Sequence, residues 1–241
     1  MTRLLLLCVA LSLLLATRVG AIAINQIDDF QDGTTQDWDS GGGGNPNPPE
    51  NRPDQGPAGL GDHVLAIIGN GGFGAGSNLV ALNPQPFTGP SQWTGDYTSA
   101  NVAMIFMSVR NPSAVPISLR LGIAAGNTFT SDGMFATTNA VSIPALSNWR
   151  NIVVPLLASD LTFSFSNTPG SPISDPNAAL TQVTQLRILH SNSVSFRGEA
   201  IAAELLVDNV VALPEPSLPL QLGVALGSLA LLQRYRRRFR V

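Results

Sequence analysis

The chain has 241 residues, of which 44% are hydrophobic, 12% charged and 6% aromatic, a globular composition that excludes a coiled coil and a charged disordered chain. The 23 Gly and 18 Pro interrupt helices and favour short strands joined by turns, which argues against a helical bundle. Between Ile24 and Leu213, six Arg stand against fifteen Asp and Glu, a formal charge of −9 within a chain of net charge −3. We therefore expect no nucleic-acid partner for this central body.

The first 23 residues have the three parts of a secretory signal peptide. Arg3 supplies the positive start, residues 4–16 the apolar run, and Ala21-Ile22-Ala23 a small-x-small cleavage site. The alternative is an uncleaved membrane anchor. Arg18 argues against an anchor, because it interrupts a run already shorter than the roughly 20 residues that span a bilayer. We expect residues 1–23 to form a signal helix that is removed on export.

The body from residue 24 to 213 is predicted to be one all-β domain, an antiparallel β-sandwich. Residues 117–124 alternate apolar and polar side chains, which indicates a half-buried strand. Residues 102–109 are apolar on both faces and predict a strand inside a sheet. No amphipathic helix of three turns is present, so a βαβ arrangement has no crossovers. The expected strands are 24–30, 63–68, 78–82, 101–109, 117–124, 140–143, 148–154, 183–190 and 204–212.

Two segments of the body are rich in glycine. Residues 32–61 contain four successive glycines and five prolines, and predict a long loop that is either functional or flexible. Residues 69–74 fit the G-x-G-x-x-G pattern of dinucleotide sites. That site needs a following helix, but Pro84 and Pro86 come next, so we expect a glycine-rich hairpin turn instead of a nucleotide site.

Trp93, Tyr97 and Arg120 are the polar and aromatic residues that best suit a sugar-binding surface. Trp93 and Tyr97 lie in a polar, glycine-containing segment, and Arg120 is on the polar side of its predicted strand. Exposed rings stack on the C–H face of a sugar, while a guanidinium binds its hydroxyls. The alternative is that Trp93 and Trp149 fill the interior of the sandwich, as large rings often do.

The C-terminus has three parts in a fixed order. Pro214-Glu215-Pro216 breaks the chain, residues 217–232 are apolar, and five of the last eight residues are Arg. Sixteen helical residues extend about 24 Å, which is short for a bilayer core of about 30 Å. We therefore predict a short transmembrane helix that holds loosely, with the Arg cluster in the cytoplasm and the body outside.

This tail resembles the PEP-CTERM sorting signal of Gram-negative bacteria that make extracellular polysaccharide, with Pro214-Glu215-Pro216 matching the signature. The resemblance implies recognition by an exosortase-type membrane transpeptidase, removal of the tail, and attachment or release of the body at the cell surface. The alternative is a single-pass anchor that is never cut. Either interpretation places the body outside the cell.

The body resembles the galactose-binding-like jelly rolls that serve as carbohydrate-binding modules. The similar segments are residues 27–30 followed by Trp38, residues 148–156, and residues 206–211. The 32–61 segment departs from the compact pattern of these modules. The resemblance implies a noncatalytic domain that binds sugar or matrix, often with one structural calcium ion near the pairing of the first and last strands.

Asp28, Asp29 and Asp208 are the candidate calcium ligands. Calcium binds several hard oxygens at once, and carboxylates on adjacent first and last strands would share one ion. The alternative is that Asp28 and Asp29 form a turn and Asp208 ends a strand. No other cofactor is expected.

The sequence offers little for catalysis. His63 and His190 are the only histidines, and neither H-E-x-x-H nor G-x-S-x-G occurs. We therefore expect a non-enzymatic, surface-sorted protein, a structural or carbohydrate-binding component of the extracellular polysaccharide matrix. The alternative is a secreted polysaccharide hydrolase whose carboxylate pair is formed from Glu199, Glu204 or the many Asp, a choice that any fifteen acids would permit.

Overall fold

The structure of the chain is a computed structural model. It describes residues 21–41, 46–72, 74, 77–84, 91–127, 131–168, 170 and 172–215. Most of the predicted signal peptide and nearly all of the predicted sorting tail, including Pro216, lie outside the described residues. No helix in the described ranges is long and apolar enough to cross a membrane.

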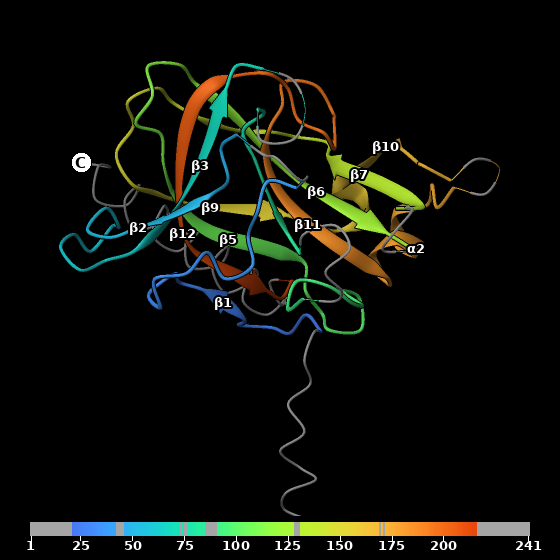
Figure 1. Cartoon of the computed structure of the whole chain (residues 1–241). Helices are drawn as coiled ribbons and strands as arrows, with labels where there is room; N and C mark the ends of the chain where they lie inside the picture. Colours follow the sequence, from blue (N-terminus) through green and yellow to red (C-terminus); the bar gives the residue numbers. More distant parts are fainter. Residues whose placement is uncertain are drawn as a thin grey trace, which may run out of the picture.

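Two antiparallel sheets form a β-sandwich (Figure 1), as the sequence predicted. Sheet A has the order β2-β3-β12-β5-β9, and β1 also pairs with β12. Because the first and last strands are adjacent, the two ends of the body meet in this sheet. The strands of sheet A are β1 (Ile27–Asp28), β2 (Glu50–Arg52), β3 (Val64–Asn70), β5 (Met104–Arg110), β9 (Arg150–Pro155) and β12 (Ala202–Leu213).

Sheet B has the order β10-β7-β6-β11-β4, and β8 also pairs with β6. Its strands are β4 (Val80–Asn83), β6 (Ile117–Ala125), β7 (Gly133–Thr137), β8 (Val141–Ile143), β10 (Leu161–Phe165) and β11 (Val183–His190). The only helical turns in the described residues are short: η1 (Ala158–Asp160) and α2 (Pro176–Leu180). The Asp175 side chain caps α2 and Pro176 begins it, a favourable start for a helix.

The core lies between the sheets and follows the period of two along the strands. Ile105, Met107 and Val109 of β5 point inward and are fully buried, whereas the alternate residues of β5 lie on the outer face of sheet A. On β12 the inner residues are Ala203, Leu205 and Val207. Glu204 and Leu206 therefore belong to the outer face.

The outer face of β6 corrects one prediction. Residues 117–124 were expected to expose one side, yet β6 is buried on both faces apart from Ser118, which is partly buried. The segment 191–200 covers this face and places the Phe196 ring over Gly122. A Cβ at Gly122 would lie only 2.9 Å from Phe196 Cδ2, so a glycine is needed there.

The described residues of the two glycine-rich segments have more structure than the sequence indicated. Within 32–61, Trp38 is buried and Asp39 pairs with Leu82 of β4, and the segment also contains β2. The motif at 69–74 begins within the last two residues of β3 in sheet A, and the next described strand is β4 of sheet B. The expected hairpin turn is therefore wrong, because this turn carries the chain from one sheet to the other.

Candidate functional site

The structure places the two predicted sugar-binding rings inside the protein. Trp93 and Tyr97 both have 0% exposure, and the Tyr97 hydroxyl donates a hydrogen bond of 3.0 Å to the Trp93 carbonyl. The prediction that these rings are exposed to a ligand is wrong. The alternative of interior packing is correct for Trp93, whereas Trp149 is only half-buried.

Asp28 supplies the acceptor that the buried Trp93 indole needs. Its Oδ2 accepts hydrogen bonds from Trp38 Nε1 at 2.7 Å and Trp93 Nε1 at 2.6 Å, and its Oδ1 accepts one from Gln92. Burial raises the pKa of Asp28 to about 6, against the effect of these three donors. The carboxylate thus accepts hydrogen bonds from two indoles that belong to separate loops. The prediction that Asp28 is a calcium ligand therefore needs correction.

Asp29 and Asp208 lie where β12 changes partner from β3 to β1. Asp208 has 1% exposure and accepts hydrogen bonds from Asn209, which has a φ of 52° at a bulge in the pairing with β5. Burial, together with the negative charges of Asp62 and Asp29, raises the pKa of Asp208 to about 7, against the effect of the hydrogen bond from the Asn209 backbone. Asp62, just before β3, is an acidic neighbour that the sequence did not indicate.

The predicted calcium trio does not fit an ion as the residues stand. Asp28 faces the indoles, and no three His, Cys, Asp or Glu side chains in the described part of the chain are grouped to hold a metal. Calcium at Asp29 and Asp208 stays a prediction.

Arg120 binds the protein's own backbone. It has 5% exposure, and its Nε donates to the Ser191 carbonyl at 3.0 Å. Its Nη1 donates to the Thr137 and Thr138 carbonyls, and its Nη2 to that of Asn192. With these four bonds the guanidinium joins β6, the end of β7 and the segment after β11. The prediction that Arg120 binds sugar hydroxyls is wrong for this conformation.

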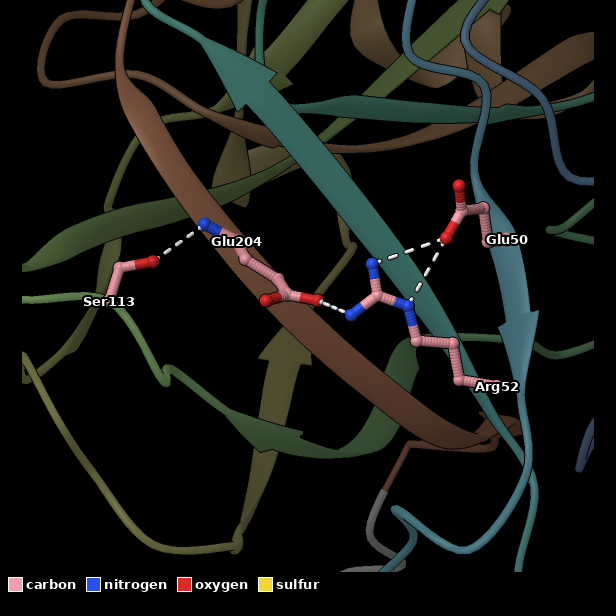
Figure 2. Close-up of polar contacts among 4 residues, drawn as sticks. All are labelled: Glu50, Arg52, Ser113 and Glu204. Carbon is pink, nitrogen blue, oxygen red and sulfur yellow. Dashed lines mark hydrogen bonds and ion pairs between the residues drawn. The ribbon is translucent and has the colours of Figure 1, made fainter.

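The outer face of sheet A carries the ion pairs of the described residues. Figure 2 shows the Arg52 guanidinium between the carboxylates of Glu50 and Glu204. The Glu204 backbone N–H donates to Ser113 Oγ at 2.7 Å. Beside this group, Trp149 packs on a small cluster made by Val64, Ala66 and Leu206, and its Nε1 donates to the Gln55 carbonyl at 3.1 Å.

The outer face of sheet B carries two Arg and two Phe side chains that the sequence did not single out. We call Arg187, Phe196, Phe165 and Arg197 the Arg–Phe array. The Arg187 guanidinium carbon lies 3.8 Å from the Phe196 ring centroid, and that of Arg197 lies 4.4 Å from the Phe165 centroid. The two rings are 6.2 Å apart at 70°. Such cation–π contacts attract a guanidinium to the face of a ring.

No signal in the sequence joins these four residues. Phe165 is on β10, Arg187 is on β11, and Phe196 and Arg197 belong to the segment that folds back over sheet B. The only local hint is the dipeptide Phe196-Arg197 after a predicted strand. Pairing of distant strands creates the array.

No known protein family and no curated protein matches the sequence. Solved structures are similar in fold. The family 11 carbohydrate-binding module from Clostridium thermocellum in complex with a β-1,3-1,4-mixed-linked tetrasaccharide has a TM-score of 0.54 and 14% identity, over 80% of this chain and 97% of that one. The solution structure of CtCBM11 has a TM-score of 0.51 and 14% identity, over 84% of this chain and 100% of that one.

A third similar structure is the family 11 module of the cellulosomal cellulase Lic26A-Cel5E of the same organism. It has a TM-score of 0.53 and 12% identity, over 80% of this chain and 95% of that one. Identities this low show the fold alone. The body is a jelly-roll β-sandwich like that of these carbohydrate-binding modules.

Proposed function

We propose that the chain is an exported, surface-sorted protein that binds extracellular polysaccharide and has no catalytic activity of its own. The observation that carries the proposal is the likeness to a carbohydrate-binding module over 80% of this chain and 97% of the module. The body therefore corresponds to a whole module rather than to a fragment of one. A binding role from fold likeness is an analogy, and it needs a direct test.

The arrangement of carboxylates supports binding over hydrolysis. A glycosidase needs two carboxyl groups facing one another across the bond to be cut. Glu204 is paired with Arg52 on sheet A, whereas Glu199 accepts hydrogen bonds from Asn192 and Ser193 in the segment over sheet B. These bonds lower the pKa of Glu199 to about 2 despite the opposing effect of desolvation, a poor value for a general acid. The two acids belong to separate clusters.

The proposal includes delivery to the cell surface. The chain leaves β12 at Leu213 and enters Pro214-Glu215 directly, so the proposed sorting signal begins where the sandwich ends. An exosortase-type transpeptidase would remove the tail after export and leave the folded body attached or released. The mass of the mature protein from the cell surface and medium tests both cleavages. We expect a chain that starts near Ile24 and ends before residue 217, whereas a C-terminus beyond Leu232 would mean a retained anchor.

Affinity electrophoresis of the purified full-length protein tests binding. Gels that contain neutral glucan, mannan or an acidic polysaccharide would slow its migration if it binds, with bovine serum albumin as the non-binding control. We expect retardation in at least one gel and no release of reducing sugar from any polymer. Release of reducing sugar would favour the hydrolase, and unchanged migration throughout would contradict a binding role.

A further inference from the structure

The Arg–Phe array brings together two positive charges that have no acidic partner in the described residues. Both ion pairs among the described residues involve Arg52, which lies on sheet A. Arg187 uses only its Nε, bonded to Gln185 Oε1 at 2.7 Å, and its Nη1, bonded to the Phe196 carbonyl at 3.2 Å. Its Nη2, and the whole Arg197 guanidinium, donate no hydrogen bond to a described residue. Donors are thus left for a ligand.

The positive charge of the Arg–Phe array is unusual in this acidic body. The body has a formal charge of −9 and only six Arg, yet two of these Arg lie within electrostatic reach of each other. Burial, with the nearby charge of Arg197, lowers the pKa of Arg187 to about 9, so the group remains a cation at neutral pH. A partly buried charge without a counter-ion is unfavourable. An anion brought by a ligand would compensate it.

The array is held in place before any ligand arrives. Phe196 fills the space above Gly122, and its backbone N–H donates to Ser164 Oγ of β10 at 3.2 Å. The Phe196 ring has 1% exposure, and it also packs with Ala124 and Met134. Arg187 is half-buried and Arg197 exposed, so one guanidinium is fixed and the other reaches solvent. Preorganised donors reduce the entropy lost on binding.

We propose that the Arg–Phe array binds the carboxylate of a uronic acid in an acidic polysaccharide. A guanidinium matches a planar carboxylate with two parallel hydrogen bonds, and two guanidiniums on adjacent rings select an acidic sugar over a neutral one. The inference rests on the proposed function and names its ligand class and its surface. That surface is the outer face of sheet B, away from the Trp93 and Tyr97 segment where the sequence located the site.

Titration calorimetry on the full-length protein tests this inference with two polyuronates, polygalacturonate and alginate. The methyl ester of polygalacturonate is the matched ligand, because it keeps the sugar backbone and lacks the charge. Arg197→Gln changes an exposed side chain and should leave the fold intact, and Arg187→Gln changes the half-buried one. Arg150→Gln is the matched control, since Arg150 is exposed on the edge strand β9 and its loss changes the net charge equally.

We expect polyuronate binding that weakens about tenfold or more in Arg197→Gln and in Arg187→Gln, and less than twofold in Arg150→Gln. Binding should also weaken with added salt, and the ester should bind at least tenfold less tightly. Equal losses in Arg197→Gln and Arg150→Gln would overturn the site, as diffuse attraction would then explain binding. Binding of neutral polymers or the ester alone would overturn the inference but leave the proposed function. Binding of no polysaccharide would overturn the proposed function itself.

Discussion

The Asp28 carboxylate joins Trp38 and Trp93, the two largest fully buried side chains of the core. The indole rings are 6.1 Å apart, and both N–H groups point to one carboxylate oxygen. A buried indole N–H without an acceptor is costly. Asp28, on β1 of sheet A, therefore fixes the two loops that carry Trp38 and Trp93. The sequence contains these three residues but does not show that they contact one another.

The first prediction concerns this carboxylate. Asp28→Asn replaces one acceptor oxygen by an amide that donates, so at least one of the three donors loses its partner. We expect a loss of about 2–4 kcal/mol in the free energy of unfolding, measured with urea at pH 7. Asp37→Asn is the control, because Asp37 is exposed, and should change stability by less than about 0.5 kcal/mol. Equal stability of the two variants would contradict the role given to Asp28.

The second prediction concerns pH and the buried Asp208. Its pKa in the folded protein is about 7, against an ordinary value of 3.8. Between these values the folded state keeps a proton that the unfolded state releases, so the contribution of Asp208 to stability falls as pH rises from about 4 to about 7. The lowered pKa of His190 acts in the opposite direction in part of this range, so a single wild-type profile is not decisive.

Asp208→Asn isolates the contribution of Asp208. We expect the melting temperature of this variant, relative to the wild type, to increase steadily from pH 4.5 to 7.5 in metal-free buffer. Asn has no ionised form to destabilise the folded state, whereas the wild type acquires a buried negative charge. A difference in melting temperature that stays constant with pH would show that Asp208 is ionised normally.

At the level of the elements, Arg120 connects three parts of sheet B. Its donors satisfy carbonyls at the end of β7 and after β11, while its own backbone belongs to β6. This guanidinium binds carbonyls at the points where β7 and β11 end. It also orients the segment that carries Phe196 and Arg197.

The third prediction follows from these bonds. Arg120→Met keeps much of the side-chain volume but leaves four carbonyls without their donor, so we expect a loss of about 2–4 kcal/mol in urea unfolding. Arg150→Met, on the exposed edge of β9, should cost less than about 0.5 kcal/mol. If Arg120→Met unfolds at the wild-type urea concentration, solvent must satisfy those carbonyls and the connection is dispensable.

The strands show how far the sequence pattern reaches. The strands predicted at 183–190 and 117–124 match β11 and β6 almost to the boundary, and in 117–124 the alternation of apolar with other residues marked the strand. β7 and β2 were missed, since β7 is buried on both faces without alternation and β2 has three polar residues. β10 was missed as well, although its sequence, Leu161-Thr-Phe-Ser-Phe165, has the alternation that predicts a strand.

At the level of the whole molecule, the β-sandwich could be predicted from the sequence, but the side chains that lie together on its surface could not. Period-two alternation and the absence of long helices indicate two packed sheets. The positions of Trp93, Arg120 and the Arg–Phe array depend on which strands become neighbours, which one sequence does not reveal. Aromatic residues that suggested a ligand proved to be core, while two arginines without any motif proved to be grouped.

The two sheets differ in the charged residues that they carry. Sheet A unites the two ends of the body and carries the Arg52 ion pairs, whereas the outer face of sheet B presents two arginines with no acidic partner among the described residues. The pairing of β1 with β12 closes the body between the two segments that the sequence predicts to be signals.

The most direct test of the account is calorimetric titration of the mature protein, recovered from the surface of the producing cells, with the extracellular polysaccharide of those cells. The account predicts saturable binding without release of reducing ends during the titration. Absence of heat from the folded protein, or steady production of reducing ends, would contradict it.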